Sequence, residues 1–381
     1  MSFEFATAGR LIVGPGRAAE FPVLLAGLGS RALICTGSRP ASHAGLLAEV
    51  RLPATVIHVD REPTTESART AAATAREHGA DVVAAIGGGS VIDLAKAVAM
   101  LLGNGGDPLD YLEVIGSGRK ITKPAVPLVA VPTTAGPGAE VTANAVLASP
   151  AHRVKASLRS ALMIPRVAIV DPLLTLSCPP PVTAASGLDA LTQCLEPFVS
   201  VRANALTDCL AAAGLRHAGT GLRRAYADGA DVGARTDMAL CSLLGGMALA
   251  NAKLGAVHGL ASAVGGAADV PHGAACAALL APVVEANVRA LRSAQPASPA
   301  LPRYAEAARL LTGDPGAAIE DGIAWIRQTV TQLRVPRLRE FGLRPEDFGD
   351  ITASAMKASS TQGNPVILAE NDLRAILNEA A

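Results

Sequence analysis

The fold of this chain is decided by one stretch, Asp81-Val82-Val83-Ala84-Ala85-Ile86-Gly87-Gly88-Gly89-Ser90. Its apolar run predicts a buried strand, and the following segment, residues 91–100, has the spacing of a helix. Three successive glycines allow a diphosphate to approach the backbone, and a helix start offers free N–H groups and a positive dipole end. The stretch therefore predicts a phosphate-binding turn. A purely structural turn is the alternative, although one glycine usually suffices for it.

The same alternation extends through the first half of the chain. Short apolar runs predict strands at residues 32–35, 55–59, 82–86, 128–131 and 167–170, and residues 66–78 and 91–102 have helical periodicity. Strands that alternate with helices are typical of a parallel α/β sheet. From Pro181 onward, long Ala- and Leu-rich segments predict helices at 182–199, 205–227, 234–250, 255–264, 272–290, 302–311 and 317–333.

We therefore expect two domains. Residues 1–178 would form an α/β dinucleotide-binding domain, and residues 179–381 an all-helical domain that holds metal and substrate. A small-molecule site is expected between two such domains.

Composition narrows the class of protein. The 381 residues contain 33 basic and 33 acidic side chains, with no dense basic stretch, which argues against nucleic acid as a partner. No uninterrupted apolar stretch reaches the roughly 18–20 residues that span a bilayer. Residues 1–10 include Glu4 and have no cationic-then-apolar run, so we expect no secretory signal. The six cysteines are widely spaced, which predicts buried thiols in the cytosol.

A second polar loop follows the predicted strand at 128–131. It begins with Pro132-Thr133-Thr134, and its hydroxyls could contact a ribose or a nicotinamide carboxamide. An ordinary surface turn is an equal alternative.

The helical half contains an acid and two histidines in apolar surroundings. Asp189 and Gln193 are four residues apart and so share one helix face. His258 and His272 follow later in the chain. A divalent metal would satisfy all of these groups, whereas hydrogen-bonded core histidines are the alternative of equal weight.

Six motifs stand in order along the chain. They are Gly87–Lys96, Pro132–Gly136, Val170-Asp171-Pro172, Gly187-Leu188-Asp189-Ala190, Pro271-His272-Gly273 and Gly363-Asn364-Pro365. Together, from about residue 5 to 376, they resemble the iron-containing (group III) alcohol dehydrogenases. The resemblance implies a dehydroquinate-synthase-like fold, an NAD or NADP cofactor and a homodimer.

The resemblance also implies roles for individual residues. The diphosphate would lie on Gly87, Gly88, Gly89 and Ser90, with Asp93 supporting the turn. Thr133 and Thr134 would contact the nicotinamide side, and Lys155 would lie near the cofactor ribose. Iron or zinc would be held by Asp189, His258 and His272, which would also be the catalytic residues, with Gln193 beside them.

Two positions depart from the family pattern. The family normally has a histidine where this chain has Gln193, and another where it has Ser262. The first change removes an imidazole ligand and predicts weak or absent metal binding; the second removes a proton-relay group. The leading hypothesis is hydride transfer between NAD(P)(H) and a small alcohol, aldehyde or ketone, assisted by metal. The alternatives are a metal-free reductase of an activated oxo-acid, similar to maleylacetate reductases, and a degenerate nucleotide-binding member.

The dinucleotide preference can be predicted from the residues after the strand at 32–36. The family often has an aspartate where this chain has Gly37, and an aspartate there would repel a 2′-phosphate. Gly37, Ser38 and Arg39 instead offer space, a hydroxyl and a cation. We expect NADP(H) to be accepted, and preferred over NAD(H), in steady-state kinetics with each cofactor. Tight binding of NADH with no detectable use of NADPH would contradict this prediction.

Overall fold

The structure, a computed structural model, describes residues 2–152, 154–268 and 270–381. The chain divides into two compact units. The α/β unit consists of Ala6–Thr134 and Gly138–Ser177. The helical unit consists of Cys178–Ala381, together with Ala135–Pro137 and the N-terminal residues up to Phe5.

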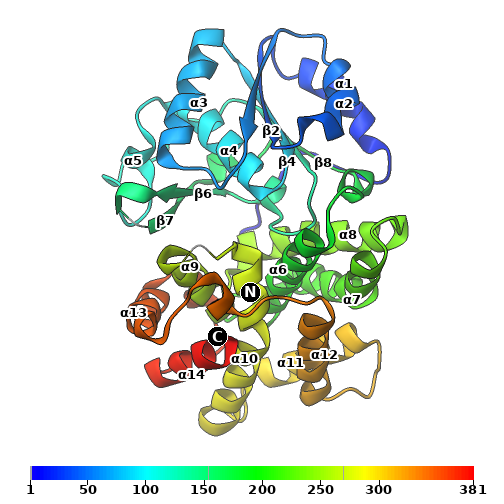
Figure 1. Cartoon of the computed structure of the whole chain (residues 1–381), viewed down its shortest axis with the longest axis vertical. Coiled ribbons are helices and arrows are strands. Elements are labelled where there is room, and N and C mark those ends of the chain that lie inside the picture. Colours follow the sequence, from blue (N-terminus) through cyan, green and yellow to red (C-terminus); the bar gives the residue numbers. More distant parts are fainter. Residues whose placement is uncertain (1, 153, 269) are drawn as a thin grey trace. The chain divides into compact units, whose positions relative to one another are not determined.

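The α/β unit is built on a six-stranded, fully parallel sheet with the order β1-β8-β5-β4-β2-β3 (Figure 1). Its strands are β1 Leu11–Val13, β2 Ala32–Gly37, β3 Ala54–Val59, β4 Val82–Gly87, β5 Leu128–Pro132 and β8 Val167–Val170. Its helices are α1 Phe21–Ala26, α2 Ala44–Ala48, α3 Thr65–His78, α4 Gly89–Asn104 and α5 Pro108–Tyr111. A separate antiparallel hairpin is formed by β6 Asn144–Ser149 and β7 Val154–Arg159.

Both faces of the parallel sheet are covered, which explains the continuous apolar character of its central strands. In β4, Val83 and Ala85 pack into a core shared with α3 and α4. Val82, Ala84 and Ile86 point to the opposite face, where they pack with Phe21 and Leu25 of α1. The α/β class and all five predicted strands are therefore confirmed. β1, which has three residues, and both hairpin strands were not predicted from the sequence, although Val154–Arg159 alternates apolar and polar residues as a half-buried strand does.

The helical unit contains α6 to α14 (Figure 1). Their bounds are α6 Pro180–Val199, α7 Ala205–Ala227, α8 Val232–Ala252, α9 Ala256–Ala267, α10 His272–Ala294, α11 Ala300–Thr312, α12 Ile319–Gln332, α13 Phe348–Lys357 and α14 Glu370–Ala380. The seven predicted helices are confirmed within a few residues at their ends, and α13 and α14 were not predicted. By length and hydropathy α10 could cross a membrane, but 78% of its apolar window is buried in the structure, as in a core helix.

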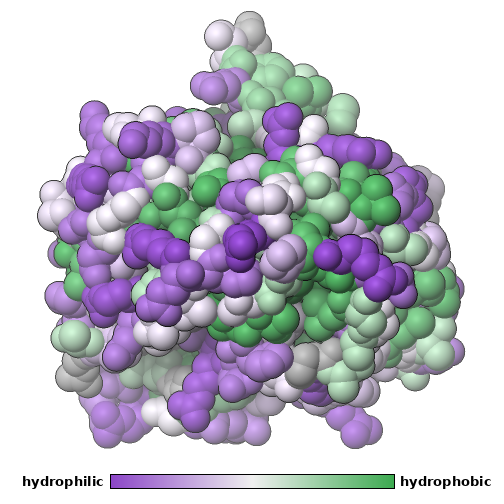
Figure 2. All heavy atoms as spheres, turned by 90° about the horizontal axis from the view of Figure 1, so that it is seen from above, coloured by the Kyte–Doolittle hydropathy of each residue, from purple (hydrophilic) through white to green (hydrophobic). Residues whose placement is uncertain are grey.

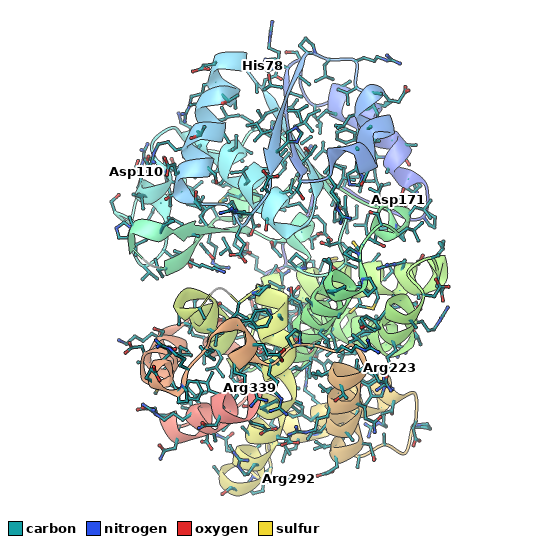
Figure 3. All side chains as sticks on the ribbon, in the orientation of Figure 1. His78, Asp110, Asp171, Arg223, Arg292 and Arg339 are labelled. Carbon is teal, nitrogen blue, oxygen red and sulfur yellow. The ribbon has the colours of Figure 1, made fainter. Side chains whose placement is uncertain are left out.

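Within each unit, polar contacts join elements that are far apart in the sequence. Asp171, labelled in Figure 3, belongs to the α/β unit. Its carboxylate accepts hydrogen bonds from the backbone amides of Gly16 and Ala18 and so fixes the segment after β1 to the end of β8. In the helical unit, the Arg223 guanidinium lies 4.6 Å from the Trp325 ring centroid and donates to Thr329 Oγ1, which joins α7 to α12.

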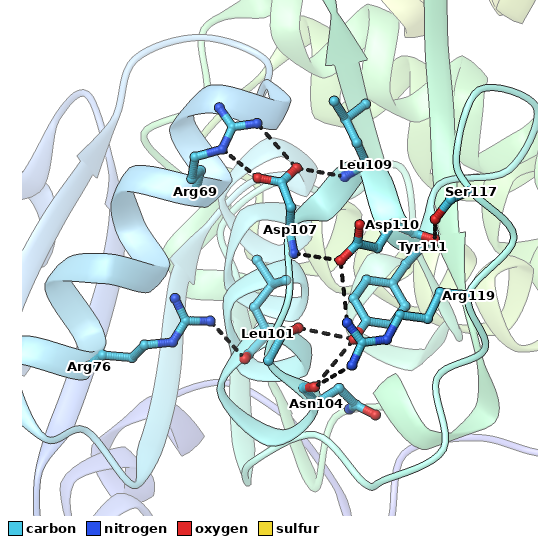
Figure 4. A network of polar contacts seen from close by, with 11 residues as sticks. Arg69, Arg76, Leu101, Asn104, Asp107, Leu109, Asp110, Tyr111, Ser117 and Arg119 are labelled. Carbon is cyan, nitrogen blue, oxygen red and sulfur yellow. Dashed lines mark hydrogen bonds and ion pairs between the residues drawn. The ribbon is translucent and has the colours of Figure 1, made fainter.

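A polar network at the end of α4 stabilises the adjacent helices (Figure 4). Arg69 of α3 forms two parallel hydrogen bonds to Asp107, which itself caps α5 through the Leu109 amide. Such bidentate pairs are geometrically specific.

Polar and apolar side chains are interspersed over the face shown in Figure 2.

A fully buried lysine anchors the hairpin to α4. Lys96 Nζ donates to Thr142 Oγ1 at 2.8 Å and to the Asn144 carbonyl at 2.9 Å. One turn earlier, Asp93 Oδ2 accepts a hydrogen bond from the Val146 amide at 3.1 Å. The helix that begins at the glycine turn is therefore held along its inner face by buried polar contacts.

Burial lowers the pKa of Lys96 to about 8, although the nearby carboxylates of Asp93 and Glu140 oppose the shift. In the unfolded chain this pKa returns to about 10. Between these values the unfolded state binds more protons, so stability from this group rises with pH. We expect the free energy of unfolding of the wild type to rise by about 3 kcal/mol relative to Lys96→Met across this window. Denaturant unfolding of both proteins at several pH values measures this difference. Free energies of unfolding that change in parallel with pH in the two proteins would contradict the prediction.

Candidate active site and metal centre

The glycine turn joins β4 to α4 and lies against the second polar loop. Gly87 ends β4, and Gly88 precedes the first turn of α4. The Thr133 amide donates to the Gly87 carbonyl at 3.0 Å. A Cβ built at Gly88 would lie 3.2 Å from Thr134 Oγ1, and one at Gly87 would lie 2.4 Å from a Val91 methyl group. The turn therefore has room for a close ligand only because side chains are missing.

Gly37 ends β2, which pairs with β4, so it lies beside the glycine turn at the carboxyl edge of the sheet. This edge is where parallel α/β sheets bind ligands. A Cβ at Gly37 would make an ordinary contact of 3.9 Å with Val91, so the position has space for a side chain. Ser38 and Arg39 are exposed.

Eight predicted cofactor-binding residues lie at the carboxyl ends of the neighbouring strands β2, β4 and β5: Gly37, Ser38, Gly87, Gly88, Gly89, Ser90, Thr133 and Thr134. The other two are Asp93, which contacts the β6–β7 hairpin, and Lys155, which belongs to it. Asp93 bonds the hairpin strand β6, as described above. Lys155, on β7, places its ammonium 2.5 Å from Glu62 Oε2. Its predicted contact with the cofactor ribose stays a prediction.

All four predicted metal ligands lie in the helical unit, and three of them converge. His258 Nε2 is 3.3 Å from Asp189 Oδ1, and His272 Nε2 is 3.9 Å from the same oxygen. The two imidazole centroids are 5.4 Å apart. A fifth residue, Cys276, joins the cluster, because its Sγ lies 3.7 Å from His272 Nε2. The donor atoms of Asp189, His258, His272 and Cys276 all lie within 4.8 Å of one another.

Local structure explains how these side chains are positioned. Asp189, Gln193 and Glu196 share the face of α6 that points at α9. Glu196 Oε1 accepts the Val257 amide at 2.7 Å, and Asn364 Oδ1 accepts the Ala256 amide at 3.1 Å. These side chains satisfy the first N–H groups of α9, as a helix start requires. His258, in that first turn, is therefore fixed in place.

The hydrogen-bond partners of the two ring nitrogens of His258 indicate a cation beside this residue. Its Nδ1 lies 2.7 Å from Glu196 Oε2, a carboxylate oxygen that can only accept, so we assign the proton to Nδ1. In the neutral ring, Nε2 is then a lone pair that faces the Asp189 carboxylate. Neither Nε2 nor Asp189 Oδ1 has a hydrogen-bond partner in the described part of the chain, and the same holds for Gln193 Oε1. Two buried acceptors that face each other repel unless a cation lies between them.

The electrostatics of the cluster show which groups carry positive charge when no metal is bound. Burial lowers the pKa of His258, but Cys276, Asp189 and Glu196 outweigh burial and raise it well above its usual value. Cys276 and Asp189 raise the pKa of His272 to about 9 against the effect of burial. Burial by itself raises the pKa of Asp189, but His258, His272 and Gln193 outweigh burial and leave that pKa below its usual value. For Cys276, burial also raises the thiol pKa, and the two imidazoles bring it below its usual value. The residues therefore fit a divalent metal, for which carboxylate, imidazole and thiolate are ordinary ligands.

Two residues of this site were not recognised from the sequence. Cys276 was interpreted only as a buried thiol, although its position four residues after His272 places both on one helix face. Glu196 was not considered at all, and its partner His258 is 62 residues away. Ser262, at the position of a family histidine, is exposed.

The parallel sheet with its glycine turn and the cluster in the helical unit define an oxidoreductase class, and comparison with known proteins identifies the family. The family model described as "Iron-containing alcohol dehydrogenase" matches residues 8–172, and "Fe-containing alcohol dehydrogenase family, C-terminal" matches residues 183–381. The chain belongs to the iron-containing alcohol dehydrogenase family. The predicted family, fold class and alcohol dehydrogenase activity are thereby confirmed.

Individual relatives and a solved structure agree with this family assignment. "Alcohol dehydrogenase 4" of Saccharomyces cerevisiae is 37% identical over 306 residues, which cover 80% of this chain and 77% of the relative. "1,3-propanediol dehydrogenase" of Klebsiella pneumoniae is 36% identical over 328 residues, which cover 84% of this chain and 81% of the relative. A solved 1,3-propanediol oxidoreductase aligns with a TM-score of 0.91 and 31% identity over the whole of both chains.

Gly273 lets α10 approach α6 closely enough for His272 to reach Asp189. A Cβ at this position would lie 2.5 Å from the Ala185 carbonyl oxygen, which belongs to the backbone and cannot rotate away. Gly273→Ala should push the start of α10 outward and weaken metal binding by about 10- to 100-fold, the range for loss of support around a ligand. Titration of apoprotein with zinc measures this. Gly266→Ala, with open space around its Cβ, is the control; equal affinities in both variants would contradict the prediction.

Proposed function

We propose that this protein transfers a hydride between NAD(P)(H) and a small alcohol, aldehyde or ketone, assisted by a divalent metal in the helical unit. The observation that carries the proposal is the buried pair of unpartnered acceptors, His258 Nε2 and Asp189 Oδ1. Two such groups 3.3 Å apart require a proton or a metal ion between them, and the further donors His272 and Cys276 favour the metal ion.

The cofactor is assigned to the carboxyl edge of the sheet. Gly87, Gly88, Gly89 and Ser90 would bind the diphosphate through the first N–H groups of α4. Thr133 and Thr134 would bind the nicotinamide side, and the space at Gly37 supports acceptance of NADP as well as NAD. The nicotinamide ring accepts or supplies the hydride.

The metal is assigned to Asp189, His258 and His272, with Gln193 one turn after the aspartate on α6. Iron and zinc both suit this set. When bound, such a metal polarises the oxygen of an alcohol or carbonyl. Glu196 holds the His258 ring so that Nε2 is available, and Asp189 supplies negative charge. The side chain of His272 is 40% exposed, which leaves one side of the cluster open to a small molecule.

The setting of the protein is also inferred. All six cysteines are free, which supports a reducing compartment such as the cytosol. A homodimer is proposed from the family resemblance alone.

A crossed pair of variants tests both halves of the proposal. Gly88→Val should abolish the fluorescence signal of bound nucleotide, because the branched side chain occupies the diphosphate's place, while metal content stays unchanged. Asp189→Asn should keep nucleotide binding but lose metal and reduce turnover on the order of 100-fold or more. Turnover is measured with a panel of small alcohols, aldehydes and oxo-acids, and circular dichroism checks the fold.

Asp350→Asn is the matched control, since Asp350 is exposed on α13 and far in sequence from the cluster. It should leave both bindings and turnover unchanged. Full turnover by metal-free Asp189→Asn would favour the metal-free reductase. Nucleotide binding without any turnover in the wild type would favour the degenerate binder.

A further inference from the structure

We propose that Cys276 is a metal ligand that substitutes for the histidine missing at Gln193, and that its thiolate makes the site selective for zinc over iron. This inference rests on the proposed function, since it concerns the same metal centre. It replaces the expectation of an incomplete ligand set with a complete set of different chemistry: one carboxylate, two imidazoles and one thiolate.

Two of the six separations between donor atoms are close to those around one tetrahedral ion. Metal–ligand bonds of about 2.0–2.3 Å at tetrahedral angles place nitrogen and oxygen donors about 3.3 Å apart, and nitrogen and sulfur donors about 3.5 Å apart. His258 Nε2 and Asp189 Oδ1 are 3.3 Å apart, and Cys276 Sγ and His272 Nε2 are 3.7 Å apart. His272 Nε2 and Asp189 Oδ1 are 3.9 Å apart and all four donor atoms lie within 4.8 Å of one another, so the side chains need only draw closer together to bind one ion.

The backbone explains why Cys276 can take this role. His272 begins α10 and Cys276 lies one turn later, so both side chains project from one face of the same helix. Cys276 is fully buried, and its Sγ points into the cluster formed with Asp189, His258 and His272. A thiol in this position binds metal by losing its proton to solvent as the sulfur–metal bond forms.

Gln193 is the weaker candidate for the fourth position. Its side chain is neutral, and its Oε1 is buried with no hydrogen-bond partner among the described residues. An amide oxygen binds zinc or iron less well than imidazole or thiolate. We therefore assign the fourth position to Cys276 and not to Gln193. Thiolate ligands favour zinc, whereas a set of carboxylate and imidazoles accommodates iron as well.

Cobalt(II) provides a direct spectroscopic test, because a bound thiolate adds a ligand-to-metal charge-transfer band in the near ultraviolet. Apoprotein of the full chain is loaded with cobalt(II) under anaerobic conditions. We expect the band in the wild type and its loss in Cys276→Ala, with cobalt affinity lower by about 100-fold or more, beyond the effect of removing an outer-shell partner. Cys241→Ala, another fully buried cysteine of the helical unit, is the matched control and should keep the band.

Metal selectivity is tested by competition. Apoprotein is incubated with equal concentrations of iron(II) and zinc(II), and bound metals are quantified. The wild type should take up zinc. The double variant Gln193→His with Cys276→Ala exchanges thiolate for imidazole and should bind iron in a larger proportion, without the charge-transfer band.

The outcomes separate the two proposals. Visible cobalt bands without charge transfer, unchanged in Cys276→Ala, would overturn the thiolate ligand and leave the metal-assisted function intact. Failure of the wild type to bind either cobalt or zinc would overturn both. A charge-transfer band that survives in Cys276→Ala and disappears in Cys241→Ala would assign the ligand to a different sulfur.

Discussion

The hydrogen bond between His258 Nδ1 and Glu196 is the interaction on which the proposed metal centre depends. The same carboxylate accepts the Val257 amide, so one side chain of α6 both caps α9 and fixes a proton on Nδ1 of its histidine. Nε2 therefore faces Asp189 either with a second ring proton or with a lone pair that a metal ion can take, so the buried arrangement requires positive charge. The chemistry of the centre is therefore built into the packing of α6 against α9.

Small residues make that packing possible. A Cβ at Gly255 would lie 2.8 Å from Glu196 Oε1 and 2.9 Å from Asn364 Oδ1, so the capping oxygens can reach the start of α9 only past a glycine. Gly273 has the same role between α10 and the Ala185 backbone of α6. In the helical unit, glycine thus allows helices to approach each other closely. In the α/β unit, glycine leaves space at the turn where the diphosphate is proposed to bind. In both units it removes a side chain where backbone or ligand must come near.

Much of the architecture was predictable because it depends on local pattern. The strand periodicity, the run Gly87-Gly88-Gly89-Ser90 and the long apolar helices each act over fewer than 25 residues, and all predicted the observed elements. The hairpin is held by contacts with Lys96, which is buried, and with Asp93, both of which belong to α4, about 50 residues earlier in the chain. No local pattern in residues 144–159 records those partners.

The sequence by itself determined the class of fold, and it predicted the glycine turn and three members of the donor cluster, because Asp189, His258 and His272 lie in recognisable motifs. Only the tertiary structure decided the surroundings of those donors. It brought Glu196 to His258 across 62 residues and turned Cys276 into the cluster, because the chain must fold before separate helices can share one site. The sequence showed members of this cluster where they lie in recognisable motifs, and Cys276 was missed although it lies one turn after His272 on α10.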